Sequence, residues 1–168
     1  MARAMWRSGP VVGLPLLFVL LATACTMPDP PEPATGTFEW TTFENSAVGF
    51  ELEVPDSYRP DVESGVHAVL FRSDTGVPVK VYWTTEAESR SRGLWFGEAP
   101  LGPTILAGRE GLLYEYVHCD GPLCSRMKSY VIPFRSRHLA LEFRSGGELH
   151  EVNRRILESF QVREPGRG

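Results

Sequence analysis

The stretch Val48-Gly49-Phe50-Glu51-Leu52-Glu53-Val54 carries an apolar residue at every second position, and Pro55-Asp56 follows it. Side chains alternate between the two faces of a β-strand, so this pattern predicts a strand with one buried face. Similar runs recur along the chain, and their short connections favour antiparallel pairing. In chain order, we expect strands over 38–42, 48–54, 66–71, 77–84, 104–107, 112–119, 127–134 and 138–144.

Two segments have a different pattern. Residues 148–160 carry apolar side chains at helical spacing and polar ones between them, which predicts a helix with one face on the sheet. Residues 86–96 begin with polar residues and are interpreted as a short helix or an ordered excursion. The predicted fold class is therefore α+β, an antiparallel β-sheet flanked by helices.

Several of these segments resemble PsbP-like domains. The segments that carry the resemblance are Phe43-Glu44-Asn45, 48–52, 54–58, Gly108-Arg109-Glu110-Gly111, Tyr114-Glu115-Tyr116, 130–133, 139–143 and 155–160. The resemblance implies an α/β/α sandwich around an antiparallel sheet. The photosynthetic members are non-enzymatic accessory subunits, and the family has no catalytic motif to carry over.

Length and charge restrict the class of protein. The 168 residues, 42% hydrophobic and 23% charged, fit one globular domain. The 17 Lys and Arg residues against 21 Asp and Glu residues leave a net charge of -4. This balance excludes a nucleic-acid binder that relies on a basic face.

Residues 1–25 have the composition of an export signal. Arg3 and Arg7 precede an apolar run over 10–21, and small residues precede Cys25. As a helix this run reaches about 18 Å, which is short of the roughly 30 Å hydrocarbon core of a bilayer. A signal peptide is therefore expected rather than a permanent transmembrane helix.

The end of this segment, Leu21-Ala22-Thr23-Ala24-Cys25, resembles the lipobox of bacterial lipoproteins. The resemblance implies a diacylglyceryl group on the Cys25 sulfur, removal of residues 1–24 and acylation of the new amino terminus. The lipid would anchor the exported protein to the bacterial cell membrane or outer membrane. A plain secretory signal whose cleavage leaves a free thiol is the alternative.

A proline-rich stretch follows the cysteine. Residues 26–36 hold four prolines and cannot bury enough apolar surface to fold, which predicts a semi-extended tether. An ordered loop packed on the domain is the alternative. The predicted segments are a signal peptide (1–24), the lipidated cysteine with its tether (25–36), a PsbP-like globular domain (37–163) and a tail (164–168).

The remaining two cysteines lie in Cys119-Asp120-Gly121-Pro122-Leu123-Cys124, between two predicted strands. The intervening residues favour a turn, so both sulfurs should meet across a hairpin and oxidise outside the cytoplasm. A redox site normally uses Cys-x-x-Cys at a helix start, which is missing here. A metal site built from His118, Cys119, Asp120 and Cys124 lacks a second ligand pair.

The chain carries no Gly-x-Ser-x-Gly, His-x-x-x-His or nucleotide-binding glycine motif. We therefore predict no catalytic residue, no metal and no cofactor, with a hydrolase site assembled only in three dimensions as the alternative. Trp95-Phe96 lies in a glycine-flanked loop and is interpreted either as a plug on the sheet or as an exposed anchor for a partner.

These observations predict a lipid-anchored cell-envelope protein that is a non-enzymatic binding or assembly module. Its expected contacts are the membrane, through the lipid, and an envelope protein, with no nucleic acid. The alternative function is a small-molecule or metal-binding lipoprotein with a cleft between the sheet and its helices.

Overall fold

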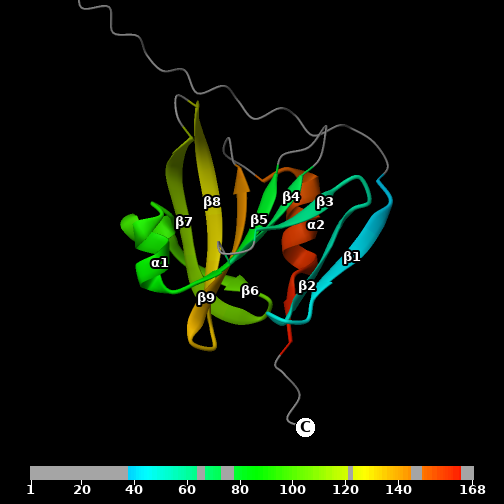
Figure 1. Cartoon of the computed structure of the whole chain (residues 1–168), viewed down its shortest axis with the longest axis horizontal. Coiled ribbons are helices and arrows are strands. Elements are labelled where there is room, and N and C mark those ends of the chain that lie inside the picture. Colours follow the sequence, from blue (N-terminus) through cyan, green and yellow to red (C-terminus); the bar gives the residue numbers. More distant parts are fainter. Residues whose placement is uncertain (1–37, 64–66, 73–77, 121–122, 145–148, 164–168) are drawn as a thin grey trace, which may run out of the picture.

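The structure, a computed structural model, describes residues 38–63, 67–72, 78–120, 123–144 and 149–163 (Figure 1). The strands are β1 (Trp40–Asn45), β2 (Phe50–Pro55), β3 (Arg59–Glu63), β4 (Ala68–Arg72), β5 (Val79–Thr84), β6 (Gly102–Leu106), β7 (Arg109–Asp120), β8 (Leu123–Phe134), β9 (Arg137–Arg144) and β10 (Gln161–Val162). The helices are α1 (Glu86–Ser91), α2 (Glu151–Ser159) and a 3₁₀ turn, η1 (Trp95–Gly97). No helix in the described ranges is long and apolar enough to cross a membrane.

The strands form two antiparallel sheets, which confirms the predicted pairing. The larger sheet has the order β3-β4-β5-β9-β8-β7-β6, and the smaller one has the order β1-β2-β10. The patterns did not predict β3 and β10. β3 contains Pro60, which donates no ladder hydrogen bond and is tolerated here because β3 is an edge strand. The connection between the strands predicted over 66–71 and 77–84 lies outside the described residues.

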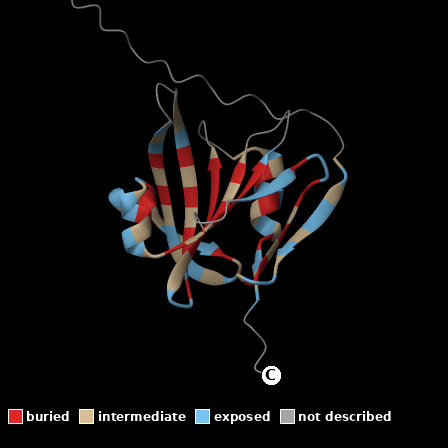
Figure 2. Cartoon of the chain, viewed as in Figure 1, coloured by how far each residue is buried: buried red, intermediate tan, exposed pale blue. Residues whose placement is uncertain are grey.

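The main core lies between the two sheets. Phe50, Leu52 and Val54 of β2 are at most 1% exposed, as the alternation in that strand predicts. They meet the apolar side chains from one face of β4, β5, β8 and β9. Figure 2 shows the buried positions recurring along these strands.

Helix α2 packs against β2 and completes the main core. Ile156 and Phe160 are buried in it, and the Phe160 ring stacks on Phe50 with centroids 5.8 Å apart. The Glu53 amide donates a hydrogen bond to the Ser159 hydroxyl at 2.9 Å, which ties the helix to the strand. Asn153 is one of the polar residues between the apolar positions of 148–160, but it is buried because it lies three residues before Ile156 and shares its face.

A second core lies on the opposite face of the larger sheet, under α1 and η1. Its members include Tyr82, Leu94 and Trp95. Helix α1 begins with a capping box, in which the Glu88 amide donates to the Thr85 hydroxyl and the Thr85 amide donates to the Glu88 carboxylate.

An ion pair attaches helix α1 to the larger sheet. Arg137 on β9 pairs with Glu88 at 2.6 Å and donates a hydrogen bond to the Trp83 carbonyl at 3.4 Å. The hydrogen bonds at Thr85 and the nearby Arg137 hold the pKa of the Glu88 carboxyl below its ordinary value. The cap and the ion pair therefore fix where α1 leaves the sheet.

The α/β/α sandwich implied by the family resemblance is matched only in part. The described chain is mostly antiparallel β-structure, and its two α-helices are short. The face opposite α1 is covered by α2 together with the smaller sheet, so that layer is mixed rather than helical.

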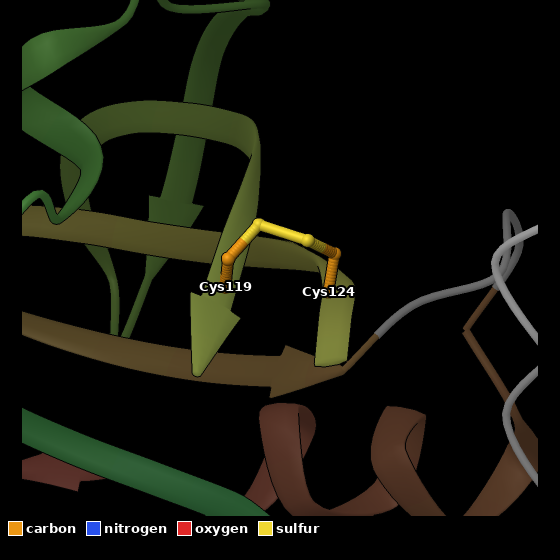
Figure 3. The surroundings of a disulfide bond; sticks show 2 residues. All are labelled: Cys119 and Cys124. Carbon is orange, nitrogen blue, oxygen red and sulfur yellow. A yellow bond between two sulfur atoms is a disulfide. The ribbon is translucent and has the colours of Figure 1, made fainter. Parts of the chain in front are cut away.

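Strands β7 and β8 extend beyond their neighbours as a two-stranded ribbon. β9 pairs with β8 only as far as Met127, so residues 123–126 have β7 as their one strand partner in the described chain. Cys119 and Cys124 lie directly opposite each other, with Cα atoms 4.0 Å apart, and form the predicted disulfide (Figure 3). The small loop that this bond closes contributes roughly 2 kcal/mol in the chain-entropy treatment.

Candidate functional site

An apolar groove opens on the same face of the larger sheet as α1 and η1. Its volume is about 340 Å³. We call this pocket the apolar groove. It is lined by Phe96, Glu110, Gly111, Leu112, Tyr114, Val131, Pro133 and His138. Side chains of hydrophobic and aromatic type dominate the lining, as in most binding sites.

The strand register explains why these residues meet. Leu112 of β7 lies opposite Val131 of β8, and Pro133 lies opposite His138 of β9. Cross-strand partners and residues two positions apart share a face of the sheet, so these side chains form a continuous floor. η1 adds Phe96, whose ring meets the His138 ring edge-to-face at 4.7 Å.

The apolar surface continues beyond the groove onto the edge strand β6. Ile105 lies opposite Glu110, and Pro103 lies opposite Leu112. Leu101 and Ile105 are each 62% exposed and Leu112 is 40% exposed. Large apolar side chains gathered around one groove differ from the scattered exposed residues of ordinary surfaces and are typical of an interaction site.

Trp95 does not belong to this exposed surface. Its side chain is 0% exposed and contacts Tyr82 edge-to-face at 5.5 Å. The hypothesis of an exposed anchor is therefore wrong for Trp95, because the glycine-flanked loop turns its indole toward the sheet. Phe96 is half-buried and lines the groove, so the two neighbouring aromatic residues have different surroundings.

His138 supplies the polar wall of the groove. Its Nδ1 is buried without a hydrogen-bond partner in the described structure. Burial lowers the pKa of the His138 imidazole below 6.5, and the carboxylate of Glu86 opposes this effect. The imidazole of His138 is therefore neutral at pH 7, and its ring packs against Phe96.

A buried carboxyl lies on the same face of the sheet, outside the groove. Glu142 of β9 is 2% exposed and lies opposite Lys80 on β5 and Ser129 on β8. The hydroxyls of Tyr116 and Ser129 both donate to its Oε2 atom, the latter at 2.9 Å. These bonds partly satisfy a group that is costly to bury.

Burial is the main influence on the Glu142 carboxyl. It raises the pKa above 4.5, although the hydroxyls of Tyr116 and Ser129 and the charges of Lys80 and His118 lower it. Burial and the neighbouring carboxyl together raise the pKa of Tyr116 well above 10.0, so Tyr116 stays a hydrogen-bond donor.

Glu142→Gln should change how stability depends on pH. Because the pKa of Glu142 is raised in the folded state, the protonated carboxyl contributes stability that is fully present below pH 4.5. That contribution is lost as pH rises through the pKa of Glu142 in the folded protein. The glutamine amide does not ionise, so its contribution does not change with pH. The free energy of unfolding of the variant should therefore rise relative to that of the parent protein as pH rises from 4 to 8. Urea unfolding at several pH values measures the difference. A constant difference across this range would contradict the assignment.

The other predicted site residues lie away from the groove or outside the described chain. Cys25 and the tether (25–36) are not among the described residues, so lipidation stays a prediction. The Cys119–Cys124 disulfide lies near the far end of β7 from Glu110. Because both sulfurs are joined, they cannot act as the thiolate ligands of the alternative metal site.

The alternative metal and hydrolase sites would each need several polar side chains close together. No group of three or more His, Cys, Asp or Glu residues gathers there in a way that could hold a metal ion. His138 lies at the groove next to Phe96. In the described structure Thr84 Oγ1 and Ser89 Oγ are buried without hydrogen-bond partners, so neither hydroxyl is bonded to an imidazole base.

Sequence reasoning missed most of the groove and the buried carboxyl. Leu101, Ile105 and Leu112 carry no motif, because their exposure depends on which neighbours cover the sheet. Glu142 had a usable signal, since it is the one charged residue within the apolar run 139–143. A lone carboxyl in such a run indicates a buried group that needs hydrogen-bond donors.

Comparisons with known proteins support the fold. No family model and no curated protein matches the chain. The solution structure of cyanobacterial PsbP (CyanoP) from Synechocystis sp. PCC 6803 matches with a TM-score of 0.50 and 12% identity, over 77% of this chain and 96% of that one. The chain therefore has a PsbP-like fold.

Two other structures are similar at lower scores. A crystal structure from Bacteroides thetaiotaomicron VPI-5482 has a TM-score of 0.49 and 10% identity over 73% of this chain, which spans about half (48%) of that protein. LpqN of Mycobacterium tuberculosis, involved in cell envelope biogenesis, has a TM-score of 0.39 and 16% identity, over 76% of this chain and 92% of LpqN.

Proposed function

We propose that this protein is a lipid-anchored, extracytoplasmic accessory module that binds another envelope protein through the apolar groove. The observation that carries the proposal is the exposed apolar surface around the groove, formed by Leu101, Ile105 and Leu112. Burying such a surface against a partner removes apolar area from water, which is the main driving force for protein association.

The sequence and the disulfide support the location. The segment ending in Cys25 resembles a lipobox, and two or three acyl chains hold a protein firmly in a bilayer. The Cys119–Cys124 bond is of the kind that persists in oxidising compartments outside the cytoplasm. The PsbP-like fold is compatible with an accessory role, because PsbP-like domains of photosynthesis act without catalysis.

Cys25→Ser should release the protein from membranes. Without the cysteine sulfur there is no attachment point for the lipid, so the variant should move from the membrane fraction to the soluble extracytoplasmic fraction. Fractionation with immunodetection measures the shift, and Cys119→Ser with Cys124→Ser serves as a control that leaves the lipobox intact. A Cys25→Ser protein that stays with membranes would contradict lipid anchoring.

Binding of a partner is tested separately by site-specific photo-crosslinking in intact cells. A photoreactive residue at Leu112 should give a discrete protein adduct that the same residue at Val62 does not give. Val62 is a suitable control because it is 57% exposed but lies on the opposite edge strand, β3. Equal labelling from both positions, or only low-mass adducts from Leu112, would contradict a protein-binding groove.

A further inference from the structure

Among the described residues that line the apolar groove, Glu110 is the one with a carboxylate. Glu110 is exposed and forms no ion pair within the described chain. Some acidic residues on the strands have basic partners, such as Glu115 with Arg126 and Glu53 with Arg155. The carboxylate of Glu110 is therefore available to a ligand.

The remaining lining groups carry no opposing charge. Phe96, Leu112, Val131 and Pro133 are apolar, and burial lowers the pKa of His138, which keeps its imidazole neutral. The chain as a whole has a net charge of -4. The lining residues thus combine an apolar floor with one carboxylate and no cation, which disfavours an anionic occupant.

We propose that the groove binds a partner-protein segment that inserts one large apolar side chain and places an adjacent Lys or Arg against Glu110. This proposal rests on the proposed function and names the chemistry of the partner. The cavity of about 340 Å³ is at the small end for ligand sites, which suits a side chain better than a large cofactor.

The surface outside the groove favours a polypeptide over a free small molecule. Leu101 and Ile105 extend the apolar area along β6, beyond the lining of the groove. A small molecule in the groove would leave these two side chains in water. A segment that continues past the groove covers them as well, so one partner accounts for both features.

The test uses short fluorescent peptides and the full mature protein reconstituted in nanodiscs. Three peptides are compared by fluorescence anisotropy: Gly-Leu-Trp-Lys-Gly, the same peptide with Glu for Lys, and Gly-Ser-Ser-Lys-Gly. The Lys peptide should bind about 1.5- to fivefold more tightly than the Glu peptide, the range of one exposed ion pair. The Ser-Ser peptide should show no saturable binding. Empty nanodiscs provide the blank.

Variants then separate the charge from the apolar contact. Glu110→Lys should reverse the preference, so that the Glu peptide binds more tightly than the Lys peptide. Leu112→Ser should weaken both peptides at least tenfold, whereas Val62→Ser on β3 should change neither. Circular dichroism establishes that each variant is folded.

Equal binding of the two charged peptides, or a preference unchanged by Glu110→Lys, would overturn the proposed partner chemistry. Such a result would leave the proposed function standing if the Leu112 crosslink to a protein still formed. Loss of that crosslink as well would contradict both.

Discussion

Replacing Trp95 by alanine should lower the free energy of unfolding by about 3–5 kcal/mol, the usual range for removing a buried aromatic side chain. Trp95 is 0% exposed and is the largest fully buried side chain in the described core. Its removal leaves a cavity beneath η1 and takes away the ring contact with Tyr82. Urea unfolding followed by circular dichroism measures the change.

Two further variants make this prediction specific. Trp95→Phe should cost less than Trp95→Ala, because it keeps an aromatic ring and removes an indole Nε1 that is buried without a hydrogen-bond partner among the described residues. Phe96→Ala should also cost less, since Phe96 is only half-buried. A decrease of less than about 1 kcal/mol in the free energy of unfolding of Trp95→Ala would show that the burial of Trp95 is not needed to hold η1 on the sheet.

Gly111→Ala should destabilise the protein by about 1–3 kcal/mol or more, because it overfills a packed site. A Cβ atom at this position would lie 2.2 Å from the Val131 carbonyl oxygen and 2.7 Å from Ile132 Cγ2. One of these neighbours belongs to the backbone of β8, so the strand itself must shift. Thermal or urea unfolding measures the loss.

Gly102→Ala is the matched control, since Gly102 also lies in a strand and nothing lies within 4 Å of its added Cβ. This variant should be neutral or slightly more stable, because alanine reduces the entropy of the unfolded chain. Similar losses of stability in the two glycine variants would mean that the close contact between Gly111 and β8 is not the reason why glycine is needed at position 111.

The strands and the main helix could be predicted from the sequence because their periodicity is local. The alternation around Phe50 and Leu52 is present in β2, and the helical spacing of Val152 and Ile156 is present in α2. The predicted helix over 148–160 begins later, at Glu151, since His150 already has an extended backbone. Edge strand β3 was not predicted because its residues, Arg-Pro-Asp-Val-Glu, contain a proline and show no apolar alternation.

The disulfide was predictable from the turn residues between its cysteines, whereas the groove was not. Whether Leu112 is covered or exposed depends on how far η1 reaches over β7, and this is a tertiary property. The same holds for Trp95 and Phe96, adjacent residues of similar chemistry that end in different surroundings. Local pattern cannot distinguish them, because both lie in a short turn without periodicity.

The ribbon of β7 and β8 has a consequence for producing this protein in recombinant hosts. Within the part of the chain that the structure describes, its outer residues have no flanking strands, and Cys119 and Cys124 hold them together. Expression in a reducing cytosol leaves two free thiols at that tip, ready to crosslink separate molecules once air enters the preparation. Secretion through an oxidising periplasm, or a host cytosol engineered to form disulfides, avoids these covalent oligomers.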